Sequence, residues 1–206
     1  MARRLRVELA FDSNNVRPVG QIAWDSDRRC AAVEWDPAFL ADPLPISPYH
    51  IKLQVGFYRT ADPAAFDGLP GVFGDSLPDG WGRLLIDREL ERRGSGRTAI
   101  TPVDRLAIIG THGMGALIYR PEEQTVDPNS VDLGWFADLA ITMAEDASVE
   151  DLRKARAATG GSAGARPKFV ALLDVRTGRV RDHRRPPEPG ERQVLIKHPA
   201  STDSPT

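Results

Sequence analysis

The sequence has 206 residues, of which 41% are hydrophobic and 27% are charged, and its formal net charge is −2 at pH 7. This length suffices for one large or two small domains, and the ordinary composition excludes a chain that is disordered throughout. The near-neutral charge provides no global basic field, so we expect no direct binding to nucleic acid and no attraction to an anionic membrane.

The sequence also lacks the signals of a membrane protein or of a metal site. No apolar run reaches the roughly 18 residues that a membrane-spanning helix requires, so we exclude membrane insertion. The single cysteine, Cys30, cannot form an intramolecular disulfide and favours a reducing cytoplasm. No two of the four histidines have the helical spacing of metal ligands, so we assign no metal-binding residues.

Short alternating apolar runs cover residues 5–57 and predict a small antiparallel sheet. Asn, Asp, Gly and Pro separate these runs, the last of which spans residues 51–57. Asp36-Pro37 and the prolines at 43, 45 and 48 argue against a helix in that segment, because proline lacks an amide donor and restricts the residue before it. We expect an extended segment that covers one edge of the sheet.

Two helices are predicted in the middle of the chain. Asp79 suits the N-cap of the first helix, which should stop at Gly94. For the second helix, Thr101 is the expected N-cap, proline follows at the first helical position, and Gly110 should end the helix. Residues 111–121 then read as a glycine turn and a strand that returns to the sheet.

Further helices are predicted after a polar, linker-like stretch at residues 122–129. Apolar residues fall on one helical face between positions 133 and 143. Ser148 and Asp151 have the spacing of a capping box, which predicts another short helix that ends near Gly160.

The C-terminal pattern is strand, turn and strand. Residues 169–175 are apolar on both faces and predict a covered strand. Residues 181–192 form a polar insertion with three prolines, which we expect to be solvent-exposed and mobile. The last strand is expected at residues 193–198. Together these patterns indicate an α+β fold.

Two segments near the C-terminus carry the residue types of a phosphate site. Residues 160–164 are rich in glycine, and Lys197 ends the last predicted strand. Glycines let backbone N–H groups surround phosphate oxygens, and a strand lysine supplies positive charge to them. Only four of the 27 basic residues are lysines, yet Lys168 and Lys197 occupy both phosphate-site positions. The order of loop, strand, hairpin, strand and lysine is that of a kinase N-lobe.

Each of these signals has a simpler explanation when it is taken alone. The glycine cluster also fits a helix C-cap followed by a turn, and a lysine at the end of an edge strand commonly only keeps that edge solvated. Asp75 and Asp79 have the spacing of an acid–base pair, but Pro78 and Gly80 beside them favour capping and turn roles.

Three segments at residues 75–83, 106–117 and 161–168 resemble, in order and spacing, the HipA-like serine/threonine kinases of bacterial type II toxin–antitoxin systems. The Leu-Pro-Asp and Ala-Gly-Ala-Arg-Pro-Lys motifs within them are the most specific features. The resemblance implies an N-terminal subdomain of mixed sheet and helices at residues 1–125. It also implies a partial kinase-like N-lobe with antiparallel strands at residues 130–206.

For the complete family enzyme, the resemblance implies ATP and Mg²⁺ as cofactors. It also implies phosphorylation of a translation component and a DNA-binding antitoxin of the HipB type as partner. The phosphate-contacting residues that it implies in this chain are Gly161, Ser162, Ala163, Gly164, Ala165, Lys168 and Lys197.

A kinase also needs an orienting Asp, an Asn and a metal-binding Asp from a later lobe, and no segment of this sequence matches that lobe. We therefore assign no catalytic residues and expect a catalytically incomplete N-terminal part of a truncated or longer kinase. An alternative is a non-catalytic module that docks on a HipA-like kinase in trans and restrains it. A third is a remnant that folds poorly beyond residue 130, because its apolar strands lack a partner lobe.

Overall fold

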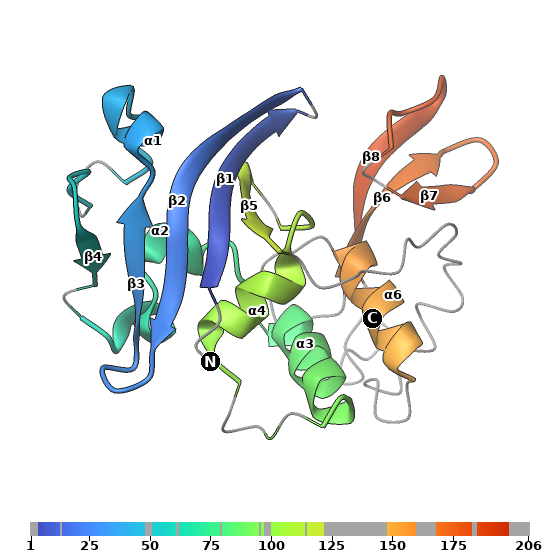
Figure 1. The fold of residues 1–206 in the computed structure, drawn as a ribbon. Helices are drawn as coiled ribbons and strands as arrows, with labels where there is room; N and C mark the ends of the chain where they lie inside the picture. The colour runs from blue at the N-terminus through green and yellow to red at the C-terminus, as the bar shows by residue number, and fades with distance from the viewer. Residues whose placement is uncertain are drawn as a thin grey trace. The chain divides into compact units, whose positions relative to one another are not determined.

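Two antiparallel sheets organise the chain, one in each of two structural units (Figure 1). The first unit contains Met1–Leu77 and Ala99–Glu123, and the second contains Pro78–Thr98 and Gln124–Thr206. The computed structural model describes residues 4–12, 14–47, 51–60, 62–78, 80–94, 96, 100–113, 115–121, 148–159, 168–182 and 185–197.

The first unit holds a five-stranded sheet in the order β4-β3-β2-β1-β5, with every neighbouring pair antiparallel. Its described elements are β1 (Arg4–Asp12), β2 (Asn15–Asp25), β3 (Cys30–Trp35), α1 (Pro37–Ala41), β4 (Phe57–Arg59), the 3₁₀ helix η1 (Ala65–Gly68), α2 (Gly71–Gly74), α4 (Pro102–Ile109) and β5 (Leu117–Arg120).

Alternation along the strands determines which face of this sheet is buried. On β1, Leu5 and Val7 are fully buried, whereas Arg4 and Arg6 are exposed. Successive side chains of a strand point to opposite faces, so one face builds the core and the other keeps its charged side chains in solvent. Phe73 of α2 and Leu106 of α4 join the strand residues in this core, so both helices pack on the apolar face.

Helix α4 has the ends that its sequence predicts. The hydroxyl of Thr101 accepts a hydrogen bond from the N–H of Asp104 at 3.1 Å, and the Asp104 carboxylate accepts one from the N–H of Thr101 at 2.9 Å. Pro102 stands in the first turn, and Gly110 follows the last residue with φ at 54°. The strand predicted after this helix is also confirmed, because β5 pairs with β1.

The prediction that residues 36–48 contain no helix is wrong. Pro37–Ala41 form the short helix α1, in which the Asp36 carboxylate accepts a hydrogen bond from the N–H of Ala38 at 2.8 Å. Pro37 occupies the first turn, where a helix has no use for an amide donor, so this proline starts the helix and does not break it.

The strand expected at residues 51–57 is wrong in its bounds as well. Only Phe57–Arg59 form a strand, β4, which pairs with β3 at one edge of the sheet. Val55 is 89% exposed, so the apolar alternation there does not correspond to a buried face. Ile51 is buried in the core without belonging to a strand.

The second unit combines two described helices with a three-stranded sheet in the order β7-β6-β8. Its elements are α3 (Gly80–Arg92), α6 (Val149–Thr159), β6 (Lys168–Asp174), β7 (Val180–Asp182) and β8 (Glu191–Lys197). Helices and two antiparallel sheets together confirm the α+β fold. Among the helices of the described ranges, none combines the length and the apolarity that crossing a bilayer requires.

The helix predicted from the Ser148 capping box is confirmed as α6. The Ser148 hydroxyl accepts a hydrogen bond from the N–H of Asp151 at 3.1 Å, and lies 2.6 Å from the Asp151 carboxylate. Two further predictions, the N-cap at Asp79 and the helix at residues 133–143, lie outside the described residues. The polar insertion predicted at residues 181–192 is partly structured, since it contains most of β7 and the start of β8.

Candidate functional site

Strands β6 and β8 bring the two predicted phosphate-site lysines together. The strands are antiparallel neighbours, and their register sets Lys168 directly opposite Lys197. Side chains of directly opposite residues share one face of a sheet, with Cβ atoms about 4.5–5.5 Å apart. A long stretch of sequence separates the two lysines, so only the fold brings them side by side.

The environment of this lysine pair is electrostatically unfavourable without a counter-ion. Lys168 is only 4% exposed, whereas Lys197 is exposed. Like charges directly opposite one another destabilise a strand pair. Within the described ranges no carboxylate forms an ion pair with either lysine; the ladder's own carboxylates, Asp174 and Glu191, face each other at its far end. A negatively charged group beside the two lysines would therefore stabilise this part of the sheet.

In sequence, the glycine-rich segment connects α6 to the strand that begins with Lys168. Helix α6 ends at Thr159 and β6 begins at Lys168, so residues 160–167 join the helix to the strand at the lysine pair. The predicted contacts of Gly161, Ser162, Ala163, Gly164 and Ala165 lie outside the described residues and stay predictions.

Next to the lysines, the same face of the ladder is apolar. Val170 stands opposite Leu195, two positions along each strand from the lysine pair, so both side chains project from the lysine face. Leu195 is 48% exposed, so part of this apolar surface is accessible. Positive charge and an accessible apolar surface therefore lie side by side.

Helix α6 supports β6 and is itself attached to α3. Trp81 and Leu85 of α3 form a small core cluster with Leu152 and Ala155 of α6. At the end of this cluster Glu89, which is fully buried, binds Arg153 at 2.9 Å and Arg156 at 3.1 Å, and it also pairs with Arg93.

The sequence analysis does not identify the arginines that bind Glu89 and so support the second unit. Burial lowers the pKa of Arg156, and the adjacent carboxylate of Glu89 acts in the opposite direction. A sequence signal was present, because Glu89 follows Leu85 by four residues and therefore falls on the buried face of the helix. Its partners could not be identified, since they belong to another helix.

The start of the Asp75–Arg83 segment, one of the three that carry the family resemblance, has a structural role in the first unit, which includes the segment's residues up to Leu77. Ser76 is 4% exposed and accepts a hydrogen bond from the hydroxyl of Tyr119 at 2.7 Å. Burial raises the pKa of Tyr119, so the phenol stays protonated and able to donate. This bond ties the segment to β5 and involves no reactive group.

Comparison with protein families identifies the family of the chain. The family model described as the HipA N-terminal domain matches residues 13–120, which is more than half of the chain. A search of curated proteins gave no significant match. The matched residues run from the start of β2 to the end of β5 and so include most of the first sheet together with α3. The chain therefore belongs to the HipA family and carries its N-terminal domain.

Proposed function

We propose that β6, β8 and the glycine-rich segment before β6 form the phosphate-binding part of the ATP site of a HipA-like serine/threonine kinase. The register that sets Lys168 opposite Lys197 carries this proposal. Two ammonium groups on neighbouring strands repel each other, and a bound triphosphate replaces that repulsion with attraction. The residues proposed to contact it are Gly161, Ser162, Ala163, Gly164, Ala165, Lys168 and Lys197.

The apolar pair beside the lysines supports a nucleotide over a simple phosphate ion. Val170 and Leu195 follow the lysine pair along the same face, and Leu195 is half exposed. Pockets for organic ligands combine apolar walls with a few charged groups that fix orientation. In this proposal the aromatic base lies against Val170 and Leu195 while the phosphates meet the lysines.

The same ladder is poorly suited to hold a metal ion or to accept a proton near the phosphates. Its carboxylates belong to Asp174 and Glu191, which stand opposite one another at the other end of the ladder, about 20 Å along the strands from the lysines. Bound Mg²⁺ neutralises phosphate charge and prefers carboxylate ligands. We therefore propose that phosphoryl transfer needs groups from a further lobe, supplied by the same polypeptide or by a second chain.

The test is to titrate ATP and MgCl₂ into the purified chain by isothermal calorimetry. Lys197→Ala should weaken ATP binding about tenfold or more, because it removes a charged contact. Lys154→Ala is the matched control, since Lys154 lies in the same unit but pairs with Glu150 on the surface of α6. ATP affinity that is equal in the two variants and in the unchanged chain would exclude the lysine pair.

Membership of the HipA family gives the chain a toxin–antitoxin context. We propose a DNA-binding antitoxin of the HipB type as its protein partner. Gel filtration of the chain with a HipB-type antitoxin tests this, and separate elution of the two proteins at micromolar concentration argues against it.

A second candidate function is a module that docks on a HipA-like kinase and restrains it in trans. It is favoured by the first unit, which encloses its own hydrophobic core, from Leu5 to Tyr119. The experiment needs the full chain, because α3 lies within residues 1–125 but packs on α6 of the second unit. Inhibition of such a kinase by the added chain supports this function, and unchanged kinase activity contradicts it.

A further inference from the structure

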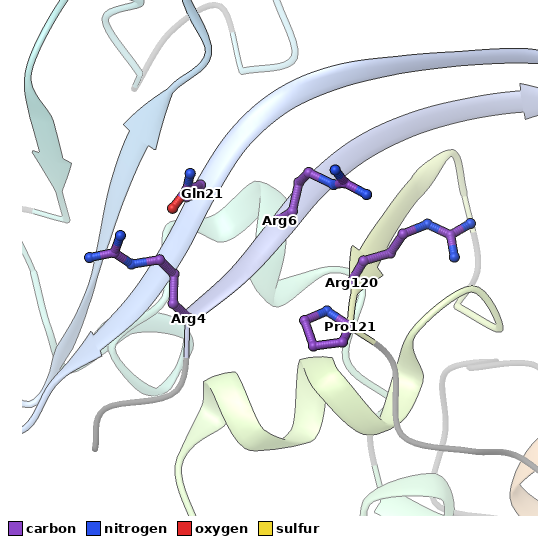
Figure 2. A pocket seen from close by; sticks show the side chains of 5 residues that line it. All are labelled: Arg4, Arg6, Gln21, Arg120 and Pro121. Atoms are coloured by element: carbon purple, nitrogen blue, oxygen red, sulfur yellow. The ribbon is translucent and has the colours of Figure 1, made fainter.

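A basic pocket lies on the solvent-facing side of the five-stranded sheet, and its residues belong to the first unit, whereas the lysine pair belongs to the second. It has a volume of about 610 Å³ and is lined by Arg4, Arg6, Gln21, Arg120 and Pro121 (Figure 2). The family match does not by itself assign any ligand to it.

The sheet register explains why these residues gather. Arg6 of β1 stands opposite Gln21 of β2 on one side and opposite Arg120 of β5 on the other. The three therefore form one cross-strand row on the exposed face. Arg4 lies two positions earlier on β1 and projects from the same face, because the residue between them, Leu5, is buried in the core.

The pocket carries an excess of positive charge. Glu8, the carboxylate beside it, lies 2.9 Å from Arg6 and 3.0 Å from Arg120, so it is shared by two arginines. Arg4 is exposed and forms no ion pair with a carboxylate of the described ranges. Among the lining residues and Glu8, three guanidinium groups thus face one carboxylate, an excess of about +2. The exposed Glu34, opposite Gln21 on β3, adds one negative charge one strand beyond Gln21 in the same row.

The lining side chains project in two directions from the sheet. Figure 2 shows Arg6 and Arg120 extending toward the same side and Arg4 turning the other way, with Gln21 between Arg4 and Arg6 and the Pro121 ring beside the start of Arg120. An exposed arginine changes rotamer within picoseconds to nanoseconds, so Arg4 can reorient toward a bound anion quickly. The proline ring offers an apolar surface beside the charges.

We infer that this pocket binds a phosphate monoester. A phosphomonoester carries about −1.5 to −2 charges at pH 7 and three acceptor oxygens, which matches the excess charge and the three guanidinium forks. Arginine binds phosphate with paired N–H donors, whereas a lysine offers only a point charge. The pocket is wider than one phosphate group, so it leaves room beside the phosphate for the organic part of the ester. The chain's net charge of −2 disfavours a long polyanion such as nucleic acid.

The test is calorimetric titration of the full chain with glucose 6-phosphate and with a short phosphoserine peptide. These two probes distinguish a small metabolite from a modified protein as the source of the monoester. Binding to either should be saturable at one site and should weaken about tenfold in Arg4→Gln and in Arg120→Gln. Glu8→Gln should strengthen binding, because it frees Arg6 and Arg120 from their shared carboxylate; a merely structural role of the arginines would not have this effect.

Two control variants distinguish binding at this pocket from binding at other positively charged side chains. Arg28→Gln removes an exposed arginine that pairs with Asp25 at a turn of the same unit, and it should leave binding unchanged. Lys197→Ala should also leave it unchanged, whereas it weakens ATP binding if the proposed nucleotide site is correct. The inference is overturned if neither probe binds saturably, if succinate binds as tightly as the monoesters, or if Arg28→Gln weakens binding as much as Arg4→Gln. Circular dichroism establishes that each variant is folded.

Discussion

Glu89 illustrates how one side chain can hold two helices in a fixed relation. The carboxylate is fully buried and contacts Arg153 and Arg156 of α6 as well as Arg93 of its own helix. Arg156 is itself 4% exposed, so its guanidinium depends on Glu89 for a compensating charge. A buried charge that loses its partner is far more costly than the pair was favourable.

We therefore predict that Glu89→Gln destabilises the second unit by about 3–5 kcal/mol, the range found when one member of a buried ion pair is removed. The amide keeps the size of the side chain, so packing changes little and the loss reports on charge. Urea denaturation followed by circular dichroism measures it.

Glu150→Gln is the matched control for that experiment. Glu150 lies on α6 and pairs with Lys154 at 2.9 Å, but its side chain is 63% exposed. Exposed helical pairs contribute about 0.3–0.5 kcal/mol, so this variant should remain close to the unchanged chain. Equal stability of the two variants would show that the Glu89 cluster is not a structural support.

At the scale of elements, Arg181 attaches the connection between β7 and β8 to the start of β8. Arg181 donates two hydrogen bonds of 2.6 Å to the two carboxylate oxygens of Glu191, and it also lies 3.0 Å from Glu188. The N–H of Glu188 donates to the same Glu191 carboxylate at 2.7 Å. The proline-rich connection is thereby attached to the strand that carries Lys197.

These contacts make the connection sensitive to acid. The Arg181 hydrogen bonds, followed by the one from the N–H of Glu188, lower the pKa of Glu191 from 4.5 to about 2. A carboxyl whose folded pKa lies below its unfolded pKa adds stability above the unfolded value, and loses it as pH falls through the folded value. We predict that the contribution of Glu191 to the free energy of unfolding is complete above about pH 4.5 and disappears toward pH 2. NMR titration of its carboxyl carbon measures the folded-state pKa that sets this range.

Arg181→Gln gives the decisive comparison for this titration. Without the guanidinium, the pKa of Glu191 should rise toward its ordinary value. Arg176→Gln, at the exposed turn after β6, should leave the titration of Glu191 in place. If Glu191 titrates near pH 4.5 in the unchanged chain, the bidentate pair is absent in solution.

Local signals account for the elements that the sequence predicts correctly. Thr101, Pro102 and Gly110 define α4, and Ser148 with Asp151 starts α6, because capping depends on residues three or four apart. The same locality explains the error at α1, because the prolines argue against a helix whereas Asp36 supplies a cap directly in front of Pro37.

Contacts between separate elements cannot be predicted from such local signals. Lys168 and Lys197 were recognisable as residue types, but their register depends on how β6 and β8 pair, which no short pattern encodes. The partners of Glu89 and the row formed by Gln21, Arg6 and Arg120 are equally invisible in sequence, because each joins separate elements.

On the scale of the whole molecule, each of the two units has its own cluster of positive charge that favours an anion. The first unit presents arginine forks on an open sheet face, and the second presents a lysine pair beside an apolar surface. A ligand that binds only the folded form of a unit stabilises that unit in proportion to ln(1 + [L]/Kd). Each ligand should therefore protect its own unit.

Hydrogen exchange measured by mass spectrometry resolves this prediction along the chain. ATP with Mg²⁺, at 100 times its Kd, should slow exchange that proceeds by unfolding of the second unit by up to about 100-fold, and the effect should appear in peptides that cover β6 and β8. Glucose 6-phosphate should instead slow exchange in β1 and β5. At the same ligand concentration, a tenfold loss of affinity lowers the protection from about 100-fold to about 11-fold. Lys197→Ala should reduce only the first effect in this way, and Arg4→Gln only the second. Protection of β1 and β5 by ATP that survives Lys197→Ala would mean that the nucleotide binds the arginine pocket, and would refute the assignment of ATP to the lysine pair.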